Sequence, residues 1–338
     1  MSRIVVIGAS GHIGSYLVPR LVRAGHDVVA VSRGASTPYL PDPAWARVDK
    51  VVIDREAAER EGAFGARIAD LRADVVIDNI CFTLDSARQL VEALRGRVQQ
   101  FIHIGTIWTH GFSEVVPTPE DVIKRPFGEY GVQKAAIEAY LLGLARREGF
   151  PATILHPGHI VGQGWTPLNP AGNGDIAAFA TIARGETLAL PNFGMETVHH
   201  VHADDIAVLA MQAMGNWSAA TGEAFHAVSP GAVTLRHYAE EMYRWFGREP
   251  ALRFDSWDEW KAMQAPENAE ATWDHISRSP NASIDKGRRL LVMRRATHRS
   301  RQCRNRCSGW SPTAGSRSSG ASLRNFCDFP LFSVTRPV

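Results

Sequence analysis

The sequence predicts an α/β protein, in which a doubly wound parallel sheet is followed by a smaller C-terminal lobe. Three observations favour this fold. Short β-branched runs alternate with amphipathic stretches up to Leu155, a rhythm typical of repeated βα units that cover both faces of a sheet. A glycine-rich turn joins the first run to the first amphipathic stretch. After His156 the rhythm loosens into turns rich in glycine and proline.

The sheet domain is expected to hold strands that alternate with helices. The predicted strands are residues 4–7, 28–31, 48–53, 75–77, 101–104 and 153–155, and the predicted helices are residues 13–24, 57–69, 86–94 and 130–147. Strands joined through helices run parallel.

The lobe is expected to contain three further helix-like stretches, at residues 176–184, 205–214 and 235–246. We expect residues 1–160 to form the sheet domain and residues 161–291 the lobe, with some lobe segments returning to the sheet. A lobe that follows the last strand would cover the carboxyl edge of the sheet, where ligands bind in open α/β folds.

Composition points to a globular protein of the cytoplasm. Hydrophobic residues make up 45% of the chain, and no apolar run reaches the roughly 18 residues that a membrane span needs. A strand-like segment begins almost at Met1, which leaves no room for a signal peptide. Cys81 is the only cysteine before residue 291, so neither a disulfide framework nor a cysteine-rich metal site is expected.

Residues 292–338 read differently from the rest. This tail is rich in arginine and serine and lacks either periodicity, which predicts disorder. Codons for residues 291–297, read one base earlier, can encode Gly-Tyr-Ala-Pro-Arg-Tyr, so we interpret the tail as an aberrant segment, with a frameshift as the leading hypothesis and an arginine-rich nucleic-acid tail as the alternative. The tail carries nine arginines and one acid, so the preceding residues of this +2 chain are acidic at about −6. Nucleic acid is therefore not expected as the main partner.

The glycine-rich turn predicts a dinucleotide site of the Rossmann type. Gly8 permits a tight turn, Gly11 lets backbone amides approach a pyrophosphate, and Gly14 allows the helix to pack closely on the strand. The helix N-terminus would then face the phosphate charge. The expected cofactor-binding residues of this loop are Gly8, Ser10, Gly11, His12, Ile13 and Gly14.

The choice between NAD and NADP depends on the end of the second strand. An NAD site usually has an acid there for the ribose hydroxyl, but this chain has Arg33, which can pair with the 2′-phosphate of NADP. We slightly favour NADP, because the alternative is an arginine that stacks on adenine. Asp54 follows the third strand, where it can meet the adenine edge or cap the next helix.

Thr106, Tyr130 and Lys134 form the candidate catalytic group. Thr106 follows the fifth strand, and Tyr130 and Lys134 stand four residues apart, on one face of a predicted helix. A tyrosine that acts as a base near neutral pH needs its pKa lowered by roughly 3 units, which an ammonium about 4 Å away can supply. Lys134 would stabilise the phenolate and reach the cofactor ribose, while Thr106 holds the substrate oxygen.

With these motifs in order, the chain resembles the extended short-chain dehydrogenase/reductase family, in its NAD-dependent epimerase/dehydratase group. The resemblance covers residues 3–291 and rests on Gly8-Ala-Ser-Gly-His-Ile-Gly14, Asp74-Val-Val-Ile-Asp78, Phe101-Ile-His-Ile-Gly-Thr106, Tyr130-Gly-Val-Gln-Lys134 with Glu138, His156-Pro-Gly-His-Ile-Val-Gly162 and Val201-His-Ala-Asp-Asp-Ile-Ala207. The resemblance implies catalytic roles for Thr106, Tyr130 and Lys134 and places Pro157, His159 and Ile160 near the nicotinamide. It also implies a small-molecule substrate and a homodimer.

Departures from the family pattern narrow the activity. Dehydratases of the family follow the threonine with two acids, whereas Ile107 and Trp108 stand here, which disfavours removal of water. Val198 and His156 replace arginines that are frequent in members acting on nucleotide sugars. Aromatic residues at 165, 179 and 193 hint at a less charged pocket, although core packing is their commoner use.

The leading hypothesis is an NAD(P)-dependent oxidoreductase or epimerase acting on a secondary alcohol or ketone of a sugar-like or other small molecule. Whether the enzyme epimerises or simply reduces stays open. The alternative is a non-catalytic module on the same fold that senses a dinucleotide or binds nucleic acid. His199, His200 and His202 lie close to Asp204 and Asp205, but we expect no metal there, since one of the two acids can cap the helix that follows.

Overall fold

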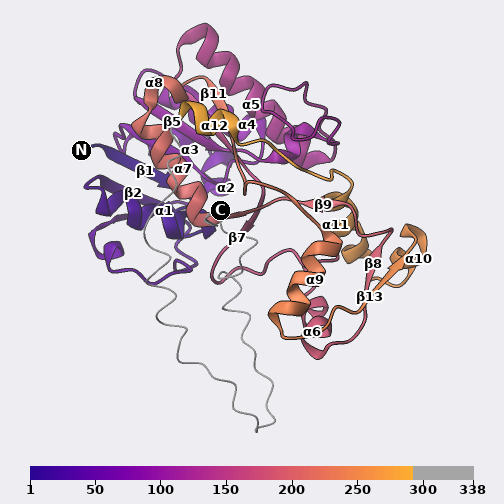
Figure 1. The fold of residues 1–338 in the computed structure, drawn as a ribbon. Helices are drawn as coiled ribbons and strands as arrows, with labels where there is room; N and C mark the ends of the chain where they lie inside the picture. Colours follow the sequence, from indigo (N-terminus) through magenta and orange to yellow (C-terminus); the bar gives the residue numbers. More distant parts are fainter. Residues whose placement is uncertain (292–338) are drawn as a thin grey trace.

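The structure, a computed structural model, describes residues 1–291, and the predictions made for the tail lie outside them. Its centre is a sheet of seven parallel strands in the order β11-β6-β5-β4-β1-β2-β3 (Figure 1). The strands are β1 (Arg3–Ile7), β2 (Asp27–Ser32), β3 (Asp49–Val52), β4 (Val75–Asp78), β5 (Gln100–Ile104), β6 (Ala152–Pro157) and β11 (Glu223–Ala227). The predicted doubly wound α/β fold is confirmed.

Helices cover both faces of the sheet because successive strand residues point to opposite sides. Ile4 and Val6 of β1 enter the core beneath α1 (His12–Arg23) and α7 (Ala203–Gly215). Val5 and Ile7 enter the opposite core, beneath α3 (Phe64–Ala69), α4 (Leu84–Leu94) and α5 (Glu129–Glu148). The strands are therefore apolar on both faces, as the buried centre of a parallel sheet requires.

Two predicted elements differ from the structure. The helix expected at residues 57–69 is two helices, α2 (Arg55–Arg60) and α3, because Gly62 turns the chain with a φ of +67°. The acids expected to cap α7 do not do so. His202 is the N-cap residue, and its Nδ1 accepts the Asp204 N–H at 3.1 Å, while the Asp204 carboxylate pairs with Arg20 of α1.

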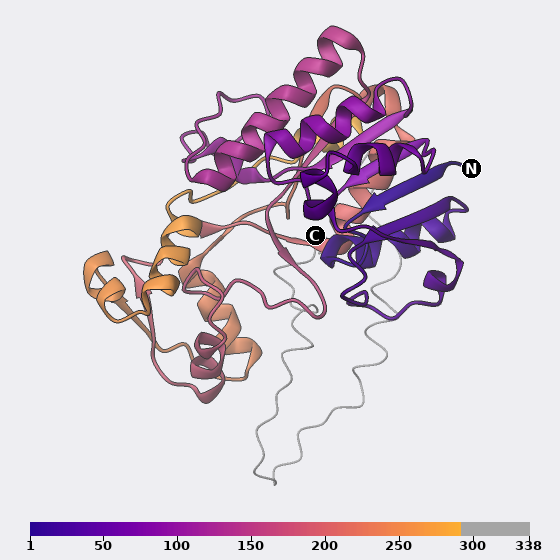
Figure 2. The ribbon, with the colours of Figure 1, turned by 180° about the vertical axis from the view of Figure 1, so that it is seen from behind.

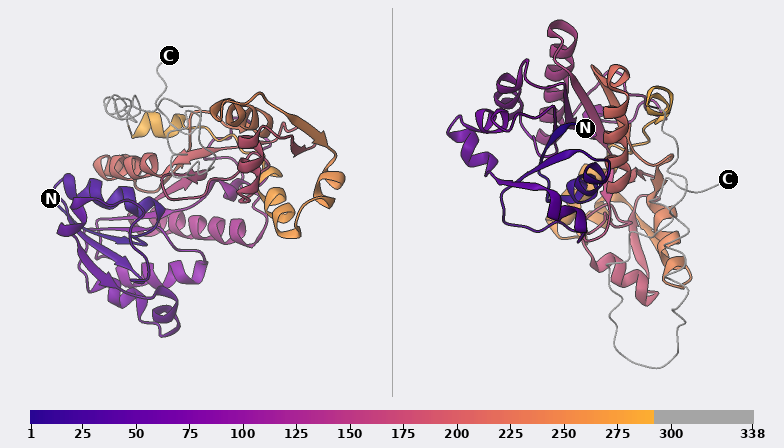
Figure 3. Two further views of the ribbon diagram at one scale, coloured as in Figure 1. Left: turned by 90° about the horizontal axis from the view of Figure 1, so that it is seen from below. Right: turned by 90° about the vertical axis from the view of Figure 1, so that its left-hand side faces the viewer.

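The lobe has its own apolar core, separate from the two beneath the sheet helices. Its elements are α6 (Ala177–Arg184), β8 (Leu188–Pro191), β9 (Thr197–Val198), β12 (Val233–Thr234), α9 (Leu235–Trp245), β13 (Leu252–Asp255), α10 (Trp257–Ala262) and α11 (Pro266–Ile276). A short parallel pair, β7 (His159–Val161) with β10 (His200–His202), lies between lobe and sheet. Figure 2 and the left panel of Figure 3 show the orange lobe at one end of the molecule and the indigo N-terminal elements at the other.

Arg278 joins the lobe to the carboxyl edge of the sheet. Its guanidinium is buried between the rings of Trp108 and Phe127, 3.9 Å from each ring centroid, and donates to the Phe127 carbonyl at 2.9 Å. Trp108 belongs to the short helix η2 (Ile107–His110) that directly follows β5 and Thr106. The remaining elements are η1 (Pro43–Arg47), α8 (Trp217–Ala220) and α12 (Asp285–Leu290). None of the helices within residues 1–291 combines the length and apolar character needed to cross a membrane.

A buried ion pair connects α2 to β4. Arg55 Nη1 lies 2.8 Å and 3.0 Å from the two carboxylate oxygens of Asp78, whose side chain is 0% exposed. Arg55 Nε also donates to Ser86 of α4 at 3.0 Å. The pair therefore fixes α2 and α4 against the centre of the sheet.

We expect Asp78→Asn to lower the free energy of unfolding by about 3 kcal/mol, because it removes the fully buried counter-charge of Arg55 and leaves only the partly exposed Glu59, 2.6 Å from Arg55 Nε. Urea denaturation followed by circular dichroism measures this change. Glu114→Gln is the matched control, since Glu114 pairs with Arg125 at 2.9 Å with both side chains more than 60% exposed, and exposed pairs contribute about 1 kcal/mol or less. Equal losses in the two variants would contradict the expectation.

Candidate active site

The glycine-rich loop brings the first turn of α1 against the end of β1. Gly8 adopts a φ of +74°, and its N–H donates to the Val31 carbonyl of β2 at 3.0 Å. At Gly14 a Cβ atom would overlap the backbone of Ala9. A side chain at Gly14 would push the helix away from the loop, and one at Gly8 would strain the backbone and overlap Ile80.

The N-terminus of α1 fits a dinucleotide's phosphates. Its N-cap residue is Gly11, no side chain caps it, and no acid lies in its first turn. The first backbone amides of a helix have no intrahelical acceptor, so those of His12, Ile13 and Gly14 can bind an anion. The expected loop residues are therefore brought together in a cradle suited to a pyrophosphate.

An aromatic cluster flanks this cradle. The His12 ring stacks on Trp165 at 5.0 Å, and Tyr39 packs edge-on against Trp165 at 5.9 Å. Burial, and to a smaller extent His202, lowers the pKa of His12 to about 4, so its ring is neutral. Trp165 thus lies at the cofactor loop, while Phe179 is in the lobe core and Phe193 is 78% exposed.

Arg33 and Asp54 follow the ends of β2 and β3, as expected, but differ in their contacts. Arg33 is exposed, and none of the acids in residues 1–291 forms a salt bridge with it. The Asp54 carboxylate accepts the Ala57 N–H at 2.9 Å and caps α2. Arg33 is available for a ligand, whereas Asp54 already has a structural role.

Thr106 and Tyr130 meet at the carboxyl edge of the sheet. Thr106 caps η2, its Oγ1 accepting the Trp108 N–H at 3.2 Å, and its side chain lies beside the Tyr130 hydroxyl. Tyr130 is 40% exposed, and its partial burial raises the pKa of the phenol, an effect that the neighbouring Thr106 partly offsets. The phenol therefore carries its proton at neutral pH, the state of a general acid, and the lowered pKa expected for a base is not seen.

Lys134 is buried below Tyr130, with 2% of its surface exposed. Its ammonium donates to the Ile104 carbonyl at 2.7 Å and lies 5.0 Å from the ring centroid of Phe82 and 5.8 Å from that of Tyr130. Burial lowers the pKa of Lys134 to about 8, although Cys81 and Asp78 favour the charged form. The lysine thus shares a helix face with Tyr130, but its ammonium donates its hydrogen bond to the strand that ends before Thr106.

The segment predicted to flank the nicotinamide spans the end of β6 and the start of β7. Pro157 ends β6, and His159 and Ile160 lie in β7. The His159 Nδ1 accepts the His199 N–H at 3.1 Å, and burial holds the pKa of His159 well below its ordinary value. His159 is therefore neutral and adds no charge at the place predicted for the nicotinamide.

The sequence reasoning missed the partner of Thr106. Its backbone N–H donates to His156 Nδ1 at 3.0 Å, and both residues are buried. On the far side of the ring, His156 Nε2 lies 3.3 Å from Glu138 Oε1. Glu138 stands four residues after Lys134, so the spacing of Tyr130, Lys134 and Glu138 was the available signal.

Asp78, Cys81 and His103 are close enough to suggest a metal site, with candidate ligand atoms within 4.8 Å of one another. The charges argue against a cation. Arg55 already binds Asp78, and the pKa of Cys81, raised mainly by burial, is about 11, so the thiol is protonated. The cluster is better explained as the environment that holds Lys134.

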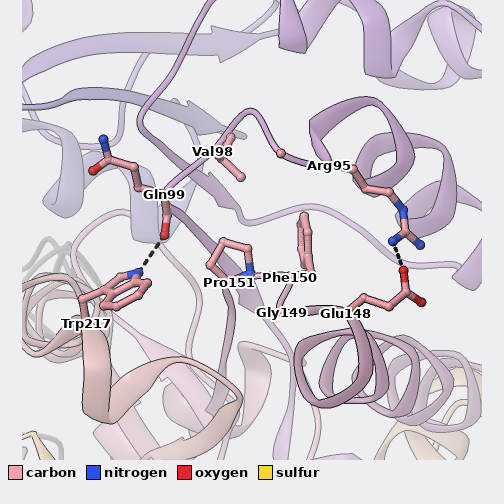
Figure 4. Close-up of a pocket in the computed structure, with 9 residues that line it drawn as sticks. Arg95, Val98, Gln99, Glu148, Gly149, Phe150, Pro151 and Trp217 are labelled. Carbon is pink, nitrogen blue, oxygen red and sulfur yellow. Dashed lines mark hydrogen bonds and ion pairs between the residues drawn. The ribbon is translucent and has the colours of Figure 1, made fainter.

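A hollow of about 630 Å³ lies far from this chemistry (Figure 4). Gln99 precedes β5 and Pro151 precedes β6, so the hollow opens at the amino edge of the sheet. The Trp217 indole donates to the Gln99 carbonyl there at 2.7 Å. The candidate active site is at the opposite edge, because Thr106 follows the carboxyl end of β5.

Known proteins share the fold of this chain. Residues 4–227 match the family model described as NAD dependent epimerase/dehydratase family. The chain is 27% identical to 2′-dehydrokanamycin reductase of Streptomyces kanamyceticus over 81% of this chain and 76% of that one. It is 26% identical to UDP-glucose 4-epimerase of Mycolicibacterium smegmatis over 63% of this chain and 73% of that one.

Among solved structures, a putative epimerase from Burkholderia cenocepacia superimposes with a TM-score of 0.66 at 24% identity, covering 86% of this chain and 91% of that one. This likeness shows the shared fold. Together with the family match over most of the sheet and its glycine loop, it confirms the resemblance drawn from the motifs. The chain belongs to the NAD-dependent epimerase/dehydratase family.

Proposed function

We propose that this protein is an NAD(P)-dependent oxidoreductase that interconverts a ketone and a secondary alcohol, with Tyr130 as its acid or base. The observation that carries the proposal is the position of the Thr106 side chain beside the Tyr130 hydroxyl, one helix turn from the buried Lys134. These groups lie at the edge of the sheet toward which the amides of α1 point. Nicotinamide chemistry supplies or accepts the hydride when the cofactor is bound.

In the reducing direction the phenol of Tyr130 gives its proton to the carbonyl oxygen as the carbonyl carbon receives the hydride. The Thr106 hydroxyl would hold that oxygen. In the oxidising direction the phenolate takes the proton back, and the Lys134 ammonium favours the phenolate by its charge. Atoms and charge balance in both directions with no further group.

We favour a reductase over an epimerase. The raised pKa of Tyr130 keeps the phenol in the donor form that reduction needs. A relative that matches 81% of the chain is named a reductase. Epimerisation uses the same three residues and is the second reading, supported by the epimerases among the relatives.

The proposed substrate is a hydroxylated, sugar-like small molecule that lacks a diphosphate. Val198, in the place where many relatives acting on nucleotide sugars have an arginine, is fully buried in the lobe core. Arg278 is held between two aromatic rings and is 2% exposed. Neither position offers a cation to a diphosphate.

Tyr130→Phe is expected to lower kcat by about 10²-fold or more, because it removes the proton donor. Steady-state reduction of a panel of ketoses and keto-sugars, followed by NADPH absorbance, measures the loss. Tyr140→Phe is the matched control on the same helix, since its hydroxyl contacts Glu92 at 3.1 Å, away from the site. Turnover of Tyr130→Phe within about threefold of the control would refute the proposed role.

A further prediction concerns the pH dependence of catalysis. The pKa of Lys134 is about 8, so its ammonium is present below this pH and is lost as the pH rises through it. If the charged form assists Tyr130, kcat/KM for the free enzyme falls above about pH 8. The rate profile of Lys134→Arg should lack this limb, because arginine stays charged throughout the range. A wild-type profile without the limb would contradict the role given to the ammonium.

Another prediction concerns the cofactor, which we propose to be NADP. Arg33→Ala should lower the ratio of kcat/KM with NADPH to kcat/KM with NADH by roughly ten- to a hundredfold, since a charged hydrogen bond contributes about 1.5–3 kcal/mol. Arg47→Ala serves as the control, because it removes an exposed arginine that precedes β3 at the opposite, amino edge of the sheet. An unchanged ratio in Arg33→Ala would favour NAD as the cofactor.

A further inference from the structure

The hydrogen bond that His156 accepts determines which of its ring nitrogens carries the proton. Because its Nδ1 accepts the Thr106 N–H at 3.0 Å, Nδ1 carries no proton, and the neutral ring holds its proton on Nε2. His156 is 0% exposed, so solvent cannot replace this acceptor. A Cβ at Gly105 would stand 2.5 Å from Nδ1, so the ring approaches the backbone as closely as a glycine allows.

Glu138 selects that tautomer. Its Oε1 lies 3.3 Å from His156 Nε2, and although the geometry is not that of a hydrogen bond, the negative charge of the carboxylate favours the proton on this nitrogen. Burial raises the pKa of Glu138, but the ion pair with Lys124 lowers it and favours the charged carboxylate. Lys124 forms an ion pair with the same oxygen.

The contacts form a continuous link between the two elements that carry the proposed chemistry. Glu138 is two turns along α5 from Tyr130, and the link runs from Glu138 through His156 to the backbone of Thr106. The helix with the phenol is thereby joined to the turn with the hydroxyl. The joint is polar and directional, so it fixes an orientation that apolar packing would leave loose.

Buried histidine contacts also hold the other end of η2, at His110. His226 Nδ1 lies 2.8 Å from the Ser283 carbonyl, to which it can donate, and its Nε2 lies 2.7 Å from His110 Nε2. His110 therefore donates to His226 in a buried pair. Both ends of η2 are held by histidines, but only His156 contacts Thr106.

We propose that His156 is a positioning residue for the reaction, holding the Thr106 backbone so that the Thr106 hydroxyl stays on Tyr130, and that Glu138 fixes the ring tautomer that does so. The inference rests on the proposed catalytic role of Thr106. It assigns a function to a position where the relatives' frequent arginine is absent.

The test separates the acceptor from the volume of the ring. His156→Leu fills the space but leaves the Thr106 N–H buried without an acceptor, and we expect kcat to fall about 30-fold with the Kd for NADPH within about threefold. His156→Asn places an amide oxygen near the position of Nδ1 and should recover at least about tenfold of that loss. Glu138→Gln, which no longer selects the tautomer by charge, should fall between them.

His199→Leu is the control for the general cost of losing a buried histidine. His199 Nδ1 also accepts a backbone N–H, that of Ala282 at 3.1 Å, but its ring does not contact Thr106. We expect a comparable fall in Tm with kcat within about threefold of wild type. If His156→Leu and His156→Asn have equal kcat, or if His199→Leu loses as much kcat as His156→Leu, the positioning role is wrong.

A second measurement needs no turnover. Nitrogen-15 NMR of the wild-type protein should show the His156 ring neutral with its proton on Nε2, and the Thr106 amide should exchange with solvent faster in His156→Leu than in His156→Asn. A proton on Nδ1, or equal exchange in the two variants, would overturn the inference. A wild-type protein that shows this NMR signature but reduces no carbonyl substrate would instead count against the proposed function.

Discussion

The buried ammonium of Lys134 determines which groups can surround it at the centre of this protein. Lys134 has almost no contact with water, and a charge in such a place needs compensation from dipoles and opposite charges. The Ile104 carbonyl supplies the dipole, and Asp78 favours the charged form. Asp78 in turn needs Arg55, which brings α2 and α4 into the arrangement. The carboxyl edge of the sheet is thus organised around one side chain, to which we assign a role in the proposed reaction.

The same constraint explains why the neighbouring histidines and cysteine are neutral. The pKa values of His103, His110 and His159 are held down chiefly by burial, and that of Cys81 is held up. Additional charges here would have no partners left. Neutral histidines and a neutral thiol at this edge, with the charged groups already paired, favour a substrate recognised by hydroxyl groups over one recognised by charge.

The sequence predicted the elements whose signals are local. Strand periodicity, the spacing of Gly8, Gly11 and Gly14, and the four-residue interval between Tyr130 and Lys134 depend only on near neighbours in the chain. The return of β11 to the sheet edge, the cap at His202 and the hydrogen bond from Thr106 to His156 depend on residues far apart in sequence. The direction of the Lys134 side chain was missed for the same reason, since its acceptor lies on another element.

The aromatic cluster of His12, Trp165 and Tyr39 affects the rates at which a coenzyme could bind and leave. They link the loops after β2 and β7 beside the first turn of α1. Breaking one such aromatic contact costs about 0.5–1.5 kcal/mol. A cluster of this kind would therefore slow the release of a coenzyme whose phosphates bind those amides. An enzyme that must exchange its coenzyme at every cycle would then spend part of each cycle opening these rings, and its turnover would be governed by their separation as well as by bond making.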